Sequence, residues 1–443
     1  MRRLMFIAVV MSMTFTACNN DEFEIPSLKS EEKEISYVVT PEEAISRLEK
    51  FLAVKGTRVS LKDVAIKMLK QSDFIPTTRS ADADNPAIYL IDIPDGGCAV
   101  MGADMRLEPV YAIMDETKLS PEDLTATTRT ESANEEDIQT FVTGLINDAV
   151  EADIMGLGPF PKDTLPFKPI PSKLDSLWTE TTVDLQVVPL LDTKWDQHEP
   201  FNNNYPMSPD GRKKAGCGII ASAQIMYYHK QPSFLGGVMF DWDLLRFYEH
   251  GYHNQPLSAT LEVANYVRTL ADASNIEIGD ELPTASVEIN TSTPQPNIVT
   301  LINAAGYSNV NFVSNTLNSI QNMLDDNHPV LISAKKTDDY SEYGNHMWVI
   351  DGCNVYKVEY WTRVYTYVND FTWSYNDYVD THHYNLLHCN YGFRGSCDGY
   401  YSSGIFNTNV ELPSGYIDTT VGDIEGTAQG NFSRDISIMM YHK

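Results

Sequence analysis

The feature that most constrains this chain is a cysteine that opens an apolar run with helical periodicity. The residues after Cys217 are apolar at helical spacing, and Pro232 limits the far end of that run. Residues 202–211, just before it, are rich in Asn, Pro and Gly and predict turns. We therefore expect a buried helix that begins at or beside Cys217. The free N–H groups and dipole of a helix start stabilise a thiolate, which predicts a nucleophile. The alternative is a buried structural cysteine, the commoner role of a single thiol.

A base for such a thiol is offered by a predicted strand farther along the chain. Side chains alternate along residues 344–352, which predicts a strand with His346 near its start and Gly352 at its end. His346 lies 129 residues after Cys217. Papain-type thiol proteases separate the Cys on their helix from the His on their sheet by about this distance. The alternative is an ordinary strand histidine.

Two amides are candidates for supporting this pair. Asn390 lies in a following predicted strand, residues 386–393, where it could orient the imidazole; otherwise it forms a turn before Gly392. Gln197 lies twenty residues before Cys217. Together with the Cys217 N–H, its side chain could stabilise an oxyanion; otherwise it is a surface glutamine.

The N-terminus has the pattern of an export signal. Arg2 and Arg3 precede a short apolar run, and Thr16-Ala17-Cys18 follows it. A cysteine in that place resembles a bacterial lipobox, so we expect residues 1–17 to be a signal peptide and Cys18 to be lipidated. Ordinary cleavage near Ala17 is the alternative. The expected location is the bacterial cell envelope, at the outer membrane, with release after processing as a further possibility.

The rest of the chain divides by composition. Residues 18–35 form an acidic tether, and 36–165 a first compact region with a helix at 41–53, strands at 87–94, 98–101 and 107–114, and a helix at 135–155. Five prolines in 156–173 predict a connection rather than a helix or strand. We therefore expect a boundary there, with residues 166–443 as a second domain.

Charge and cysteine usage exclude several function classes. The chain has 32 basic and 61 acidic residues, a net charge of −29, which argues against nucleic acid as a partner. No CxxC pair occurs, and the histidines at 382, 383 and 388 lack convincing ligand spacing, so no metal and no cofactor are expected. At most one disulfide can form among Cys353, Cys389 and Cys397, and the sequence does not decide whether it does.

These motifs together resemble the streptopain family of bacterial cysteine peptidases. The likeness rests on five segments that cover nearly the whole chain after the signal. They are the nucleophile segment 215–229, the histidine segment 346–352, residues 390–400, residues 190–202 with Gln197, and residues 97–112 in the first region. The resemblance implies an α+β, papain-like catalytic domain behind an inhibitory prodomain, with Cys217, His346, Gln197 and Asn390 in the catalytic roles.

The chain departs from the family pattern at several places. Tyr391-Gly392-Phe393-Arg394-Gly395 stands where the family usually has Trp-Gly-Trp-Gly-Gly, so Tyr391 and Phe393 are expected to form the wall of the substrate cleft. Gly218 replaces a bulkier residue, and Met347 stands where small residues are usual. Residues 353–385 are longer than expected and predict an aromatic hairpin that either packs its own rings or forms a flap beside the cleft.

The sequence therefore predicts a cysteine endopeptidase made as an inactive zymogen. Protein or peptide substrates, the chain's own prodomain as an intramolecular inhibitor and a lipid anchor are the expected partners. The alternatives are a surface-binding lipoprotein of the same fold with impaired catalysis, and a related acyl-transfer enzyme.

Overall fold

The computed structural model describes residues 37–54, 61, 64–75, 84–94, 96–125, 138–155, 174–208, 211–250, 255–278, 291–335, 345–369, 372–406 and 435–443. The expected signal peptide, Cys18, the acidic tether and the proline-rich connection lie outside these residues. In the described parts, no helix combines the length and apolar character needed to cross a membrane.

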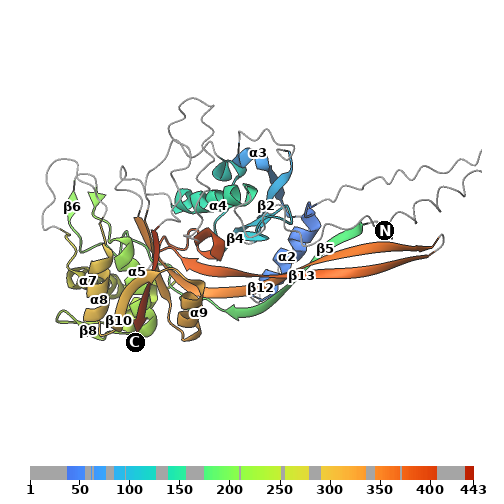
Figure 1. The fold of residues 1–443 in the computed structure, drawn as a ribbon. Helices are drawn as coiled ribbons and strands as arrows, with labels where there is room; N and C mark the ends of the chain where they lie inside the picture. The colour runs from blue at the N-terminus through green and yellow to red at the C-terminus, as the bar shows by residue number, and fades with distance from the viewer. Residues whose placement is uncertain are drawn as a thin grey trace, which may run out of the picture. The chain divides into compact units, whose positions relative to one another are not determined.

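Residues 37–155, called the N-terminal region below, pair a small antiparallel sheet with two longer helices (Figure 1). The strands run in the order β1-β2-β3-β4. The predicted helices and strands of this region are confirmed to within a few residues. Its elements are α2 (Pro41–Val54), β1 (Ile66–Lys70), α3 (Gln71–Phe74), β2 (Pro86–Asp92), β3 (Cys98–Gly102), β4 (Val110–Met114), η1 (Pro121–Leu124) and α4 (Ile138–Ile154).

Residues 174–443, called the C-terminal region below, combine helices with longer strands. The predicted helix at Cys217 is α5. The elements in order are β5 (Leu174–Val187), β6 (Met207–Ser208), β7 (Gly211–Arg212), α5 (Cys217–His229), β8 (Phe234–Leu235), β9 (Val238–Met239), α6 (Trp242–Leu245), η3 (Arg246–Tyr248), α7 (Leu257–Ser274), α8 (Gln295–Ala304), β10 (Ser308–Ser314), α9 (Leu317–Asp325), β11 (Val330–Lys335), β12 (Asn345–Asn369), β13 (Thr372–Asn390), β14 (Gly399–Ser402), η4 (Ser403–Phe406) and β15 (Asp435–His442).

One sheet runs through both regions. Its order is β1-β2-β3-β4-β14-β13-β12-β11-β15-β10, with β5 added to β12. The joint between the regions is the antiparallel pair of β4 and β14, in which Gly399 faces Met114 and Tyr401 faces Ala112. The expected division into two domains therefore crosses a continuous hydrogen-bonded sheet.

The predicted aromatic hairpin is present and is longer than expected. The strand predicted to end at Gly352 instead continues as β12 to Asn369, and β13 already begins at Thr372. The expectation of a strand end at Gly352 is therefore wrong, because Gly352 lies at a register shift rather than at a turn. β5 pairs along β12 from Leu174 to Val187, which makes a three-stranded ribbon (Figure 1).

Two apolar clusters hold the structure. The larger cluster surrounds α5 and includes the buried face of α4. The second joins α2 and the N-terminal strands to the base of the ribbon. Cys353, Cys389 and Cys397 are all buried thiols, so no disulfide links them. Among the residues described, no group of His, Cys, Asp and Glu side chains could hold a metal ion.

Candidate active site

Cys217 is the first residue of α5 and is partly exposed, whereas the next ten residues of the helix are buried. The turn before it depends on Gly216, whose φ of 94° favours glycine. A Cβ on Gly216 would also come within 2.7 Å of the Thr293 methyl group. Local structure thus places the thiol at a helix N-terminus, where the helix dipole favours its thiolate form.

Thr293 is a neighbour of Cys217 that the sequence did not indicate. Its hydroxyl oxygen accepts from the Gly218 N–H at 3.2 Å and lies 3.7 Å from the Cys217 sulfur. The threonine thereby provides a hydrogen-bond acceptor for one of the first N–H groups of α5. These groups have no acceptor within the helix itself.

His346 lies on β12 opposite Ala334 of β11, as the predicted strand required. Its Nε2 is 3.1 Å from the carbonyl oxygen of Tyr391. A carbonyl can only accept, so Nε2 carries the proton and the neutral ring keeps its lone pair on Nδ1. Nδ1 is therefore the nitrogen able to take a proton from a thiol.

Aromatic rings enclose His346. Its ring stacks on Trp348 at 5.9 Å between centroids, and Phe393 lies at 5.4 Å. Phe141, from α4 of the N-terminal region, meets the imidazole edge-on at 5.5 Å. Burial lowers the pKa of His346 to about 4, although the hydrogen bond to the Tyr391 carbonyl acts in the opposite direction. The ring is accordingly neutral at neutral pH in this state.

Asn390 is fully engaged with partners other than His346. Its amide nitrogen donates to the Thr193 carbonyl at 2.6 Å, and its oxygen accepts from Gln224 at 3.1 Å and from the Gly392 N–H at 3.2 Å. In this structure the acceptor for His346 is the main-chain carbonyl of the next residue, Tyr391. The orienting role expected for the Asn390 side chain stays a prediction.

Gln197 is held by its backbone to the segment just before Cys217. Its carbonyl accepts from the N–H of Ala215, two residues before Cys217, at 2.9 Å. Arg394 holds the same segment from the other side. Its guanidinium donates to the Asp196 carboxylate and, at 3.1 Å, to the Glu199 carbonyl, while its N–H donates to the Trp195 carbonyl. These contacts hold the backbone at Gln197 beside the segment that leads into α5, and the oxyanion role of its side chain stays a prediction.

A small cavity lies beside the thiol, and several of the singled-out residues line it. Tyr391 is fully buried, and Phe393 is partly buried against His346. Their expected part in the cleft wall stays a prediction, but both contact His346. The lining residues are Cys217, Ile220, Ala221, Gln224, Met347, Trp348, Asn390, Tyr391 and Gly392.

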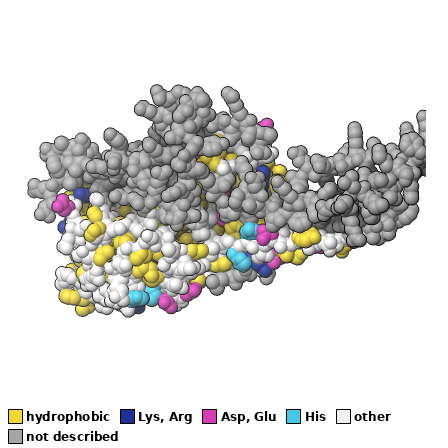
Figure 2. Space-filling model, in the orientation of Figure 1, with side chains coloured by type: hydrophobic (Ala, Val, Ile, Leu, Met, Phe, Trp, Pro, Cys, Tyr) yellow, Lys and Arg dark blue, Asp and Glu magenta, His cyan; other side chains and the backbone are white. Residues whose placement is uncertain are grey.

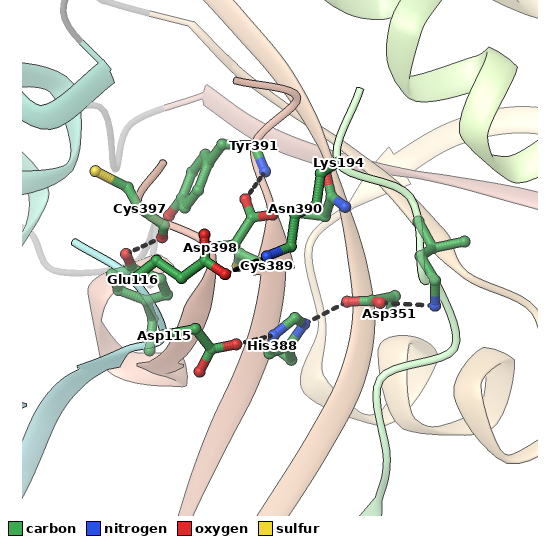
Figure 3. Close-up of polar contacts among 12 residues, drawn as sticks. Asp115, Glu116, Lys194, Asp351, His388, Cys389, Asn390, Tyr391, Cys397 and Asp398 are labelled. Atoms are coloured by element: carbon green, nitrogen blue, oxygen red, sulfur yellow. Dashed lines mark hydrogen bonds and ion pairs between the residues drawn. The ribbon is translucent and has the colours of Figure 1, made fainter. Parts of the chain in front are cut away.

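Behind Tyr391 a charged network reaches the N-terminal region (Figure 3). The carboxylate of Asp398 accepts from the Tyr391 N–H at 2.8 Å. His388 lies between Asp351, at 2.6 Å, and Asp115 of the N-terminal region, at 3.4 Å. Burial alone would lower the pKa of His388, but the charge of Asp351 and the hydrogen bonds to both carboxylates raise it to about 10. His388 is therefore charged and joins the two regions electrostatically.

Comparison with known proteins gives one family match and similar solved structures. Residues 195–401 match the model of the Peptidase C10 family. No curated protein matches the chain. A solved mutant fragment of prointerpain A from Prevotella intermedia has 17% identity and a TM-score of 0.50, covering 85% of this chain and 98% of that one. The active interpain A cysteine protease of the same organism has 18% identity and a TM-score of 0.39, covering 57% and 94%.

The fold and the family match together define a papain-like cysteine peptidase of α+β architecture. Its residues 195–401 are similar to the Peptidase C10 family, in line with the resemblance to the streptopain-like peptidases. Residues 174–443 are 270 of the 443 residues of the chain, so a structural likeness over 85% of the chain must extend into the N-terminal region. The predicted resemblance to the streptopain family, the α+β papain-like fold and the cysteine peptidase class are confirmed.

Proposed function

We propose that this protein is an endopeptidase zymogen in which Cys217 is the nucleophile and His346 the base. Nδ1 of His346 takes the thiol proton, and the sulfur attacks the peptide carbonyl carbon. The oxyanion is stabilised by the Cys217 N–H and the Gln197 side-chain amide. Nδ1–H then protonates the leaving amine as the C–N bond breaks, which leaves a thioester. Water, deprotonated by Nδ1, hydrolyses the thioester and restores the thiol.

The observation that best supports a latent form is the contact between Phe141 and His346. Phe141 also meets Trp348 at 5.8 Å and Tyr391 at 6.2 Å, so one residue of α4 closes the aromatic cluster around the imidazole. A histidine whose pKa is about 4 cannot form an imidazolium partner for the thiolate at neutral pH. Activation then requires α4 to leave, after cleavage in the 130–190 region.

Labelling tests this proposal. An alkylating probe should modify Cys217 in the processed chain much faster than in the full chain, and the signal should disappear in Cys217→Ala. Processed wild-type protein should hydrolyse casein, and Cys217→Ala should not. Equal labelling before and after processing would count against inhibition by the N-terminal region. A processed chain that binds protein but never forms a thioester would favour the non-catalytic alternative.

Lipidation of Cys18 is proposed with this function, on the sequence pattern alone. It would tether the zymogen to the bacterial cell envelope, at the outer membrane. Expressed in a bacterial host, the wild-type chain should partition with membranes, and Cys18→Ser should not. Equal partitioning of the two would remove the anchor from the proposal.

A further inference from the structure

We propose that the ribbon of β5, β12 and β13 is a docking arm that keeps residues 37–125 bound after the chain is cut. The inference concerns the unusually long segment 353–385, whose expected roles were a self-packed hairpin or a substrate flap. It rests on the proposed function only in assuming that the chain is cut on either side of α4.

The base of the arm is part of the core of the N-terminal region. Phe51 of α2 meets Tyr356 edge-to-face at 4.8 Å between ring centroids. The arm side chains in this shared cluster are all 5% exposed or less; they are Tyr356, Val358, Tyr360, Tyr384 and Leu386. All but Leu386 come from the long segment, so that segment packs against α2 and the N-terminal strands rather than against itself alone.

Polar contacts follow the same surface. Lys50 of α2 donates to the Thr181 carbonyl of β5 at 2.9 Å. Arg47, which is buried, donates to the Thr179 hydroxyl at 3.3 Å and to the Pro109 carbonyl at 3.4 Å. Both basic side chains of α2 thus reach β5, which lies on one side of β12 in the arm.

The sheet adds main-chain bonds to this docking. β4 pairs with β14, and the Asp115 N–H donates to the Asp398 carbonyl at 2.9 Å. Departure of residues 37–125 would leave Gly399–Ser402 as an unpaired edge, which promotes association with other strands. It would also uncover the arm cluster, in which the three tyrosines alone have ~150–250 Å² of surface each. Soluble monomers rarely expose apolar patches of more than a few hundred Å².

The outer part of the arm differs from its base. Tyr375, Tyr378 and Val379 of β13 are 43–55% exposed. In Figure 2, hydrophobic side chains are visible along the described part of the ribbon. The base and the outer part of one ribbon therefore provide matched positions: Val358 is 0% exposed and Val379 is 49% exposed.

Cutting the chain in the inert Cys217→Ala background tests the proposal. Recognition sequences for a specific protease are inserted in 126–137 and 156–173, so that digestion frees α4 as a separate peptide. Residues 1–125 should still co-elute with the C-terminal region in gel filtration and appear as a 1:1 complex by native mass spectrometry. A soluble C-terminal region that elutes alone would overturn the proposal. Activity is not measured, so failure here leaves the proposed chemistry untouched.

Variants then test the arm itself. In the digested protein, Val358→Ala should increase the dissociation rate of residues 1–125 by on the order of tenfold, and Val379→Ala should change it less than twofold. If Val358→Ala fails to fold, Lys50→Met provides the same test at an exposed side chain, with Glu49→Gln as its control. Equal dissociation rates in the buried and exposed variants would remove the docking role from the arm.

Discussion

Met347 occupies the space that a side chain at position 218 would need. A Cβ on Gly218 would lie 2.8 Å from the Met347 sulfur and 2.8 Å from the Thr293 hydroxyl oxygen. The family pattern has a bulkier residue at 218 and small residues beside the histidine. The two departures are therefore one exchange of side-chain volume between α5 and β12, beside Cys217.

This exchange predicts energetic coupling between the two positions. Gly218→Ala should lower the free energy of unfolding by about 1–3 kcal/mol through overpacking, and Met347→Ala should lower it by about 2–5 kcal/mol through a cavity. The double variant should lose less than the sum, by about 1 kcal/mol or more, because the new methyl group enters the new cavity. Urea unfolding of all four proteins measures this.

Gly144 supplies the control for that cycle. It lies within α4, and a Cβ there would have nothing within 4 Å. Gly144→Ala should therefore be neutral or stabilise the protein by up to about 1 kcal/mol. Strict additivity of the 218 and 347 variants would contradict the exchange.

A second prediction concerns the aromatic contact that encloses the base. Phe141→Ala should raise the alkylation rate of Cys217 in the uncut chain by on the order of tenfold. The expected cause is a rise of about one unit in the pKa of His346, which increases the protonated fraction of its ring at pH 7 about tenfold. Thr140→Ala, at an exposed neighbouring position of α4, should leave the rate unchanged. Rates at pH 7 with a small alkylating reagent give the comparison. A Phe141→Ala rate equal to wild type would mean that α4 does not control the base.

The residues that the sequence predicted at the site are those whose pattern is local. The helix start at Cys217 and the strand at His346 follow from periodicity and turn residues, and both are present. The partner of His346 was not predictable, because it is a main-chain carbonyl, which every residue has. Phe141 was one of several apolar residues on an amphipathic helix, and only the tertiary structure shows that it reaches a histidine two hundred residues later.

The fold shows the same limit. Most helices and strands of the N-terminal region were predicted from their own periodicity. The pairing of β4 with β14 joins residues nearly three hundred positions apart, and no local pattern specifies such a partner. Likewise Gly352 looked like a strand end, but the chain passes it in extended form because β5 and β13 pair on both sides.

Arg394 provides a third prediction, for a residue that holds the segment around Gln197 in position. It has a φ of 58° and stands where the family usually has glycine, and it holds the segment around Gln197 through Asp196 and Glu199. Arg394→Ala should lower kcat of the processed enzyme about tenfold with little change in KM. Gln197→Ala, which removes the donor itself, should lower it by about 10²–10³.

The control for Arg394 is another paired arginine. Arg268 bonds to Asp272 on the surface of α7, and Arg268→Ala should leave kcat unchanged. Arg394→Lys should recover only part of the activity, because an ammonium cannot reproduce the forked contact to a carboxylate and a carbonyl. A normal kcat in Arg394→Ala would show that Gln197 needs no such support.

The last prediction concerns pH and a buried acid between the two regions. Glu108 of the N-terminal region accepts from the Ser402 hydroxyl at 2.9 Å. Burial, reinforced by the nearby Asp153, raises the pKa of Glu108 to about 8 from an ordinary 4.5. Because its pKa is raised on folding, the contribution of Glu108 to the free energy of unfolding is fully present below pH 4.5 and is lost as the pH rises through 8. Glu108 therefore makes the wild-type protein less stable at pH 8 than at pH 5.

Glu108→Gln should remove that loss, because its amide oxygen can still accept from Ser402 but cannot ionise. Thermal unfolding between pH 5 and 8 should show a smaller decline for the variant than for wild type, with higher stability at pH 8. Asp153, whose pKa burial raises to about 6, acts in the same direction and leaves a residual slope at the acidic end. Glu49→Gln, at an exposed position, should follow wild type throughout. An unchanged slope in Glu108→Gln would mean that Glu108 already ionises in the folded protein, and the contact with Ser402 would then be a charged one.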